Sequence, residues 1–197
     1  MKQINKYIQE RLHINKDIKS YNYHPKTNNE LKELVDKLIK ERGNKADLND
    51  IDTSEITDMN MIFYNSNFIG DISKWDVSNV KNMRNMFYIS KFDGDISNWN
   101  VSNVKDMNGM FAYSKFNSDI SNWDVSNVED MNGMFNHSKF NEDISNWNVS
   151  NVKDMGHMFC ESPFNGDISQ WDVSKVKNTW YMFIGSPLQQ NLPEWYK

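Results

Sequence analysis

Six tryptophans recur at intervals of 24 residues and mark the same position in successive units of the chain. They are Trp75, Trp99, Trp123, Trp147, Trp171 and Trp195. One further interval backwards reaches Ile51, which marks a degenerate first unit. A fixed period between 20 and 50 residues is typical of stacked units that contact only their neighbours. The sequence therefore predicts a repeat solenoid over residues 46–197, with about six 24-residue repeats.

Residues 95–118 show the pattern within one repeat. Trp99 and Val101 are apolar with one polar residue between them, which is typical of a short strand with both apolar side chains directed inward. The next apolar residues are spaced as on one face of a helix: Val104, Met107, Met110 and Phe111. The sequence thus predicts an α/β solenoid with one short parallel strand and one short helix in each repeat. Phenylalanines and methionines at the repeat spacing are expected to fill its core.

Residues 1–45 lack the repeat and show helical patterns instead. An apolar stripe predicts a helix over residues 2–15, and a loose alternation predicts a short strand over residues 18–23. The first coil of a solenoid has an open apolar end, which needs a cover. We therefore expect residues 1–45 to form an N-terminal helical cap.

The clearest helix signal in this cap lies over residues 28–42. Thr27 and Glu30 have the spacing of a capping box, in which each side chain bonds a backbone amide near the other residue. Gly43 stands where a helix commonly ends.

The net charge of −5 is distributed unevenly. Residues 1–45 carry 11 Lys and Arg against 6 Asp and Glu, whereas residues 46–197 carry 11 against 21. This asymmetry indicates either two surfaces with different partners or a solvated acidic array with a mildly basic cap. Nucleic-acid binding through the basic cap is a further alternative. Its lysines alternate with acidic residues at helix-pairing distances, a pattern that ordinarily supports a helix.

An aspartate recurs in the same bend of each repeat, at Asp47, Asp71, Asp95, Asp119, Asp143 and Asp167. These carboxylates are expected to accept hydrogen bonds from amides of the bend. Calcium binding is the alternative, because Ca²⁺ is held by several oxygen ligands. A serine column, at Ser66, Ser90, Ser114, Ser138, Ser162 and Ser186, is expected to bond other bend amides.

A polar stripe follows the predicted strands. The residue after each tryptophan alternates between carboxylate and amide, at Asp76, Asn100, Asp124, Asn148 and Asp172. The residue before each tryptophan is also polar, at Lys74, Asn98, Asn122, Asn146 and Gln170. Repeat solenoids bind partners through such surfaces, so we predict that this stripe contacts a protein partner.

Residues that vary between repeats form a second candidate surface. Tyr88, Tyr113 and His137 lie near the end of the predicted helices, and residues of this kind often dominate the binding energy of interfaces. Either they contact a partner, or they vary because no packing constraint acts on them.

The last repeat departs from the pattern. Trp180, Tyr181, Trp195 and Tyr196 place four aromatic residues near its end. We predict that this end mediates dimerisation, and pairing of two such ends would close a two-fold dimer.

The frame Ile-x-x-Trp-x-Val resembles the Leu-x-x-Leu-x-Leu frame of leucine-rich repeats. The full unit Asp-Ile-Ser-x-Trp-(Asp/Asn)-Val-Ser-Asn-Val-x-x-Met-x-x-Met-Phe is similar to the BspA-like leucine-rich-repeat proteins of bacteria, over about residues 47–197. The resemblance implies a right-handed, curved solenoid with parallel strands on one face. Many members of that family are cell-surface adhesins, and the resemblance supplies no catalytic residues.

No catalytic pattern is apparent in the sequence. Its four histidines do not recur in register with a nucleophile and an acid, and its single cysteine, Cys160, excludes an intramolecular disulfide. We expect a non-enzymatic protein-interaction scaffold without cofactor or metal, whose acidic stripe engages a basic partner such as a nucleic-acid-handling protein. The start of the chain lacks the apolar region of a signal peptide, which predicts a cytoplasmic location, or the cell surface if a signal has been removed. A surface adhesin or structural protein is the competing class.

Overall fold

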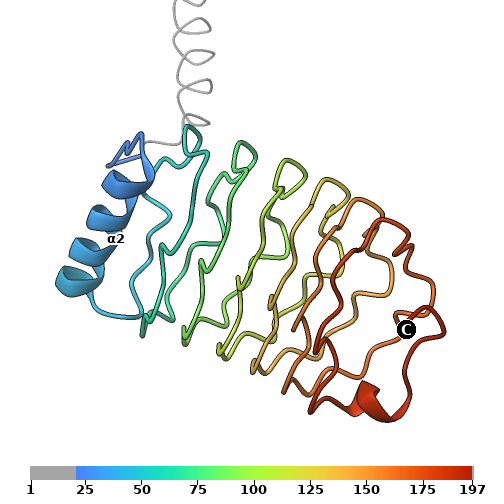
Figure 1. Cartoon of the computed structure of the whole chain (residues 1–197). Coiled ribbons are helices and arrows are strands. Elements are labelled where there is room, and N and C mark those ends of the chain that lie inside the picture. Colours follow the sequence, from blue (N-terminus) through green and yellow to red (C-terminus); the bar gives the residue numbers. More distant parts are fainter. Residues whose placement is uncertain (1–20, 197) are drawn as a thin grey trace, which may run out of the picture.

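The computed structural model describes residues 21–196, which form a helix at one end followed by a stack of coils (Figure 1). The helix is α2, Asn28–Arg42, and a short 3-10 helix, η1, Pro187–Gln190, lies in the last coil. The predicted helix over residues 2–15 lies outside the described residues. Of the predicted strand over residues 18–23, only a single parallel bridge between Tyr23 and Ile51 is described.

Helix α2 begins and ends as its sequence predicts. The Glu30 amide donates to Thr27 Oγ1 over 3.2 Å, and the Glu30 carboxylate accepts the Lys26 amide over 2.6 Å. At the other end, Gly43 has a φ of 87° and its amide donates to the carbonyl of Ile39. The predicted helix over residues 28–42 is confirmed.

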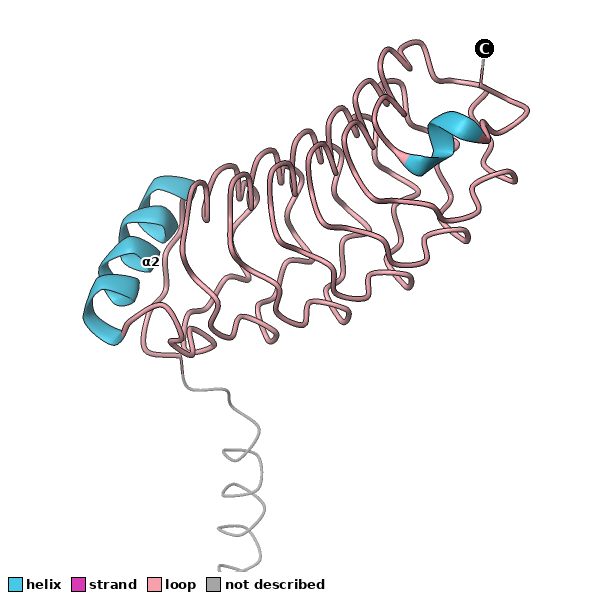
Figure 2. Ribbon diagram, turned by 90° about the horizontal axis from the view of Figure 1, so that it is seen from below, coloured by secondary structure: helices cyan, strands magenta, loops and turns pink. Residues whose placement is uncertain are grey.

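Helix α2 lies across the first coil and closes the N-terminal end of the stack (Figures 1 and 2). Leu31, Val35 and Leu38 are fully buried and belong to the same apolar cluster as the coils. Arg42 makes two hydrogen bonds of 3.0 Å to the carboxylate of Asp50 in the first coil. This paired guanidinium holds the pKa of Asp50 below its ordinary value.

The coils contain neither the helices nor the strands predicted for each repeat. Within residues 21–196, α2 and η1 are the helices, and parallel pairing is limited to isolated bridges, one for each pair of adjacent coils along most of the stack. These bridges run through a column that includes Asn82, Asp106 and Asp130, not through the Trp-x-Val segments. The prediction of short strands and short helices within the repeats is therefore wrong.

The segment predicted as a helix is instead a series of turns that bonds to the next coil. In residues 82–89, the amides of Met83, Asn85, Phe87 and Ile89 donate to carbonyls one coil further on, over 2.8–2.9 Å. The amides of Met86 and Tyr88 donate to carbonyls three residues back in the same coil, and that of Arg84 donates to Asn82 Oδ1. We call this segment, with its equivalents 24 residues apart, the turn ladder.

Left-handed residues explain why the turn ladder is not a helix. An α-helix requires right-handed backbone at every residue. Here a positive φ recurs every four residues, for example at Asn85 (52°) and Ile89 (55°) and again at Gly109 (61°) and Tyr113 (56°). Each left-handed residue changes the direction of the chain, so that alternate peptide groups point out of the coil. Their N–H groups therefore bond the neighbouring coil and not their own.

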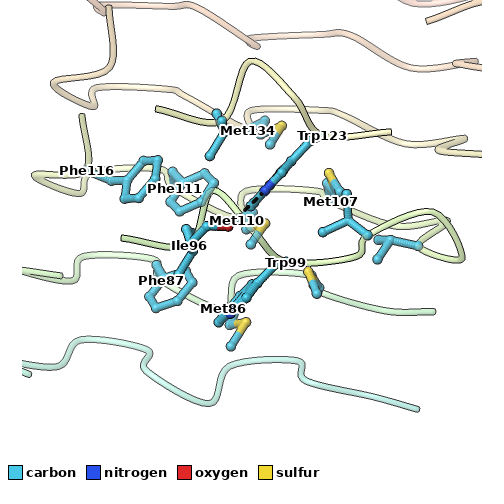
Figure 3. Packing of buried hydrophobic residues seen from close by; sticks show 14 of the residues in the cluster. Met86, Phe87, Ile96, Trp99, Met107, Met110, Phe111, Phe116, Trp123 and Met134 are labelled. Atoms are coloured by element: carbon cyan, nitrogen blue, oxygen red, sulfur yellow. Dashed lines mark hydrogen bonds between the residues drawn. The ribbon is translucent and has the colours of Figure 1, made fainter. Parts of the chain in front are cut away.

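The Trp-x-Val segments have the predicted side-chain directions but not the predicted pairing. Trp99 and Val101 are buried and Asn100 between them is exposed. Tight turns on both sides, closed by Trp99 N–H to Ile96 O and Val104 N–H to Val101 O, leave too few extended residues for a strand. The indole joins the coils instead: Trp123 Nε1 donates to the Ile96 carbonyl of the preceding coil over 3.1 Å (Figure 3).

Stacked aromatic rings fill the core, as predicted. The Phe87 and Phe111 rings lie 5.5 Å apart and almost parallel, and Phe111 stacks on Phe116 of its own coil at 4.1 Å. The methionines beside them, including Met107 and Met110, are fully buried (Figure 3). The methionines therefore fill the interior of the coils.

Side-chain oxygens close the bends. The predicted aspartate column accepts amides two residues on, as when Asp119 Oδ1 bonds the Ser121 amide over 2.8 Å. These bonds hold the pKa of Asp119 below its ordinary value. The first five serines of the predicted column do the same, with Ser114 Oγ accepting the amide of Phe116. The hydroxyl of the sixth, Ser186, instead donates to the Phe183 carbonyl over 2.8 Å. The turn role is confirmed for the aspartates and for these five serines.

Candidate interaction surfaces

The polar stripe predicted to bind a partner lies on the surface. Its members are exposed: Lys74, Asp76, Asn98, Asn100, Asn122, Asp124, Asn146, Asn148, Gln170 and Asp172. Half of them also close turns. Asp124 Oδ1 accepts the Ser126 amide over 3.0 Å, and Asn100 Oδ1 accepts both the amide and the hydroxyl of Ser102.

The turn role of this stripe explains why both aspartate and asparagine are found in it. Both residues carry the oxygen that accepts the amide, so either one closes the bend. Hydrogen bonds from the Ser126 hydroxyl and amide lower the pKa of Asp124, and those from Ser174 lower the pKa of Asp172. The stripe is thus polar and partly engaged in its own backbone, and the described side chains of these columns include no apolar anchor.

The variable residues form a continuous aromatic row. Tyr88 and Tyr113 lie 5.5 Å apart between ring centroids, and Tyr113 stacks on His137 at 4.5 Å with an angle of 16°. Tyr64, which the sequence prediction omitted, extends the row by stacking on Tyr88 at 5.2 Å. We call Tyr64, Tyr88, Tyr113 and His137 the aromatic row.

The aromatic row changes column halfway along the stack. Tyr64 and Tyr88 follow the core phenylalanines directly, whereas Tyr113 and His137 stand one residue later. The later position has left-handed backbone, with φ of 56° at Tyr113 and 52° at His137. Sequence spacing alone separates these residues into two columns, so the row becomes apparent only in the structure.

A lysine follows the row at the repeat spacing. Lys91, Lys115 and Lys139 are exposed and stand two residues after Ile89, Tyr113 and His137. Ile89 is itself 43% exposed. The 24-residue spacing of these lysines was visible in the sequence and was overlooked. The face therefore combines apolar rings with positive charge.

A second acidic column was also overlooked. It runs along the isolated bridges as Asp58, Asn82, Asp106, Asp130, Asp154 and Asn178. Burial raises the pKa of Asp130, and the flanking Asp106 and Asp154 add to this effect. Burial also acts on Asp154, but hydrogen bonds from Asn132 and Asn178 outweigh it and lower its pKa. Asp106, Asp130 and Asp154 thus stand in consecutive coils, and asparagine side chains donate hydrogen bonds to Asp154.

No metal centre is apparent in the part of the chain that the structure describes. Residues 21–196 contain no group of three or more His, Cys, Asp or Glu side chains arranged to hold an ion.

The basic residues of α2 are largely paired, with Lys32 bonded to Asp36 and Lys37 lying 4.0 Å from Glu41. These lysines thus form the i,i+4 pairs within the helix that the sequence predicts.

The four aromatic residues predicted to mediate dimerisation fall into two groups. Trp180 and Tyr181 are 76% and 56% exposed. Trp195 instead donates its indole N–H to the Ile168 carbonyl over 2.9 Å, and Tyr196 packs edge-on against Phe183 at 5.0 Å. Two of the four therefore close the last coil of their own chain.

Trp180 and Tyr181 border an open pocket of about 410 Å³ at the C-terminal end of the stack. Thr179, Ile184 and Tyr196 complete its lining. This lining carries neither a carboxylate nor a histidine.

Comparison with known proteins places the chain in a repeat family. The model of the family described as "Mycoplasma protein of unknown function, DUF285" matches residues 29–138 and again residues 90–195. No curated protein and no solved structure matches the chain. Within residues 21–196, no helix is both long enough and apolar enough to cross a membrane. Because the two matches together span most of the sequence, the chain belongs to this Mycoplasma repeat family.

Proposed function

We propose that this chain is a repeat solenoid that acts as a non-enzymatic protein-interaction scaffold, with the aromatic row as its main contact surface. The observation that carries the proposal is the surface stack of Tyr64, Tyr88, Tyr113 and His137, in which Tyr88 is half-buried and the other three are exposed. Large rings held in fixed positions bind with little loss of side-chain freedom, and such residues dominate the energy of many interfaces. The turn ladder fixes the backbone beneath them through four hydrogen bonds for each pair of coils.

The charge beside the row indicates the chemistry of the partner. Lys91, Lys115 and Lys139 recur in three of the four coils of the row, on a chain whose net charge is negative. Exposed like charges of this kind favour a complementary surface and speed its association. The partner that fits presents apolar groups flanked by carboxylates.

The polar stripe supports a competing arrangement. Asp76, Asp124 and Asp172 are exposed and would face a basic partner, such as a protein that handles nucleic acid. This arrangement lacks apolar anchors, so we place it second.

Two matched triple variants distinguish the surfaces. The first replaces Tyr88→Ser, Tyr113→Asn and His137→Asn. Asparagine fits the left-handed positions because Asn65 occupies the same column with a φ of 51°. The second replaces Asp76→Asn, Asp124→Asn and Asp172→Asn, and it keeps every bend closed because Asn100 and Asn148 already do so in alternate coils.

Partners captured from native lysate on the immobilised wild-type protein would be identified by mass spectrometry and purified for calorimetry. We expect the first variant to weaken binding at least tenfold and the second to leave it unchanged. Loss only in the second variant would favour the polar stripe and a basic partner. Unchanged binding in both would overturn the assignment to these surfaces.

Where the protein acts is a separate proposal. The sequence pattern favours a cytoplasmic scaffold, whereas the finer likeness to BspA-like leucine-rich-repeat proteins favours a surface adhesin. Protease treatment of intact native cells separates the two, because a surface protein is digested and a cytoplasmic one is protected.

A further inference from the structure

The turn ladder is one-sided. From residue 83 to residue 89, and in the equivalent residues of other coils, the amides that leave the coil point toward the C-terminal end of the stack, and the carbonyls that accept them point toward the N-terminal end. Asn85 N–H to Asn108 O and Gly109 N–H to Asn132 O are successive examples, both 2.8 Å long. The first residue of the segment bonds the other way, as Asp106 N–H does to Lys81 O of the preceding coil over 3.3 Å. Beyond that residue, the segment presents only donors on its C-terminal side and only acceptors on its N-terminal side.

The chain itself covers part of the acceptor end. The side chain of Asn28, at the start of α2, donates to the carbonyls of Asp58 and Asn60 over 3.3 and 3.0 Å. Helix α2 then lies across the first coil (Figure 1). A second chain that bonded these two carbonyls would have to displace Asn28.

The donor end is open in the part of the chain that the structure describes. The amides of Thr179, Tyr181 and Phe183 are equivalent to those that donate onward in every earlier coil, yet within residues 21–196 they have no acceptor. The fourth amide of the row, that of Gly185, is bonded by Gln189 Oε1 over 2.9 Å. Backbone donors left unpaired beside apolar side chains are costly, so an external acceptor has free energy to gain there.

Apolar side chains surround these three amides. Trp180 is the most exposed large hydrophobic residue among those described, and with Tyr181, Ile184 and Tyr196 it lines the pocket of about 410 Å³. An aromatic anchor beside a row of amides is the combination that binds an extended peptide by edge addition, where main-chain bonds supply affinity and a pocket supplies specificity.

The direction of these three backbone N–H groups decides between possible occupants. A two-fold dimer that set residues 179–183 of two chains against each other would face donors with donors, so this segment opposes that symmetric pairing. A head-to-tail copy would meet α2 and the Asn28 side chain, which already bonds two of the carbonyls at the other end. An extended segment that offers carbonyls faces neither obstacle.

We propose that the last coil binds an extended peptide segment of a partner protein. The segment accepts hydrogen bonds from Thr179, Tyr181 and Phe183 and places an apolar side chain against Trp180. The proposal shares with the proposed function the premise that the chain binds proteins, but it uses a different face from the aromatic row.

The test uses a synthetic peptide with the sequence of residues 130–141, because this segment accepts the same kind of bonds inside the array. A scrambled peptide of the same composition is the control. Binding would be followed by fluorescence anisotropy, and the amides by nitrogen-15 NMR and hydrogen exchange. We expect saturating peptide to slow exchange at Thr179, Tyr181 and Phe183 at least tenfold and to leave Gly185 unchanged.

Two variants complete the test. Trp180→Ala is expected to weaken peptide binding at least tenfold, because it removes the anchor without touching the core. The Tyr88, Tyr113 and His137 triple variant described above should bind the peptide like wild type, which separates this site from the aromatic row. Equal binding of the scrambled peptide, or no protection of the three amides, would overturn the proposal. Protection that appears without peptide and rises with protein concentration would instead assign this end to self-association.

Discussion

The indole of each repeat tryptophan links adjacent coils at the scale of a single residue. Trp75, Trp123 and Trp147 donate to a carbonyl of the preceding coil over 2.9, 3.1 and 3.2 Å. Their rings are nearly fully buried and lie against the phenylalanine stack. A tryptophan in this column therefore contributes both packing and a specific polar bond, which a phenylalanine cannot supply.

We expect Trp123→Phe to lower the free energy of unfolding by about 1–2 kcal/mol, from the lost hydrogen bond and the space left by the smaller ring. Urea denaturation followed by circular dichroism measures the change. Trp195→Phe is the control, because Trp195 is only partly buried and lies in the last coil, and it should cost less. Equal losses at both positions would contradict the argument from burial.

The acidic column that runs along the isolated bridges predicts opposite effects of an aspartate-to-asparagine substitution at two of its positions. The pKa of Asp130 is raised by burial and by its two neighbours, so its charge destabilises the fold above the pKa of the unfolded chain, about 3.9. That of Asp154 is lowered, so its charge contributes stability that is lost as pH falls through the folded-state pKa. At pH 7, Asp130→Asn should raise the unfolding free energy by about 0.5 kcal/mol and Asp154→Asn should lower it by a similar amount.

The Asp130 difference should vanish once the pH falls below the pKa of the unfolded chain, and the Asp154 difference only once the pH falls below the lowered folded-state pKa of Asp154. Thermal unfolding at several pH values measures them. Changes of the same sign at pH 7 would show that burial at Asp130 and the asparagine hydrogen bonds at Asp154 do not act as described.

At the scale of the element, the turn ladder depends on residues that accept left-handed backbone. Gly109 and Gly133 occupy equivalent positions and share a φ of 61°. A Cβ on Gly133 would have no atom nearer than 3.8 Å, whereas one on Gly109 would lie 2.2 Å from Asn85 Oδ1. Backbone strain acts at both positions, whereas crowding acts only at Gly109, where the Asn85 side chain would have to move.

Gly133→Ala should therefore cost about 1 kcal/mol, the usual penalty for a left-handed alanine, and Gly109→Ala should cost more. Gly133→Asn should cost less than Gly133→Ala, because asparagine tolerates this backbone and Asn85 already adopts it. Melting temperatures of the three variants order the effects. A larger loss in Gly133→Ala than in Gly109→Ala would refute the role of Asn85.

These elements also show where sequence reasoning succeeded and failed. The capping residues of α2 and the buried columns were predictable, because capping and burial depend on local chemistry and on periodicity. The Val104–Phe111 segment was misread as a helix, since spacings of three and four residues also arise when tight turns follow one another. No residue type marks the left-handed positions consistently: they hold Asn85, Gly109 and Tyr113, among others. For the same reason the aromatic row was only partly foreseen.

At the scale of the whole molecule, each coil contacts its neighbours through the same bonds, so the stack should tolerate the loss of one complete unit. Deleting residues 119–142 joins Ser118 to Asp143 and keeps every column in register. We expect this variant to fold and to unfold with a denaturant dependence reduced by roughly one eighth, in proportion to its length.

Deleting only residues 119–130 is the matched control. This change places turn-ladder residues opposite Trp-x-Val segments, so the inter-coil bonds cannot form and cooperative unfolding should disappear. Circular dichroism with urea titration measures both variants. Cooperative unfolding of the half-unit deletion would show that the columns do not hold the stack together.

The one-sided turn ladder also determines how the molecule responds to mechanical force. Its inter-coil bonds lie along the stacking axis, and one chain crossing joins each coil to the next. Tension applied between the two ends therefore loads one interface after another. Helix α2 reinforces the first interface, whereas within residues 21–196 only the short helix η1 and the Trp195 bond to Ile168 lie at the last one. Under load the protein should lengthen in steps, as one coil after another separates from the stack, starting from its C-terminal end.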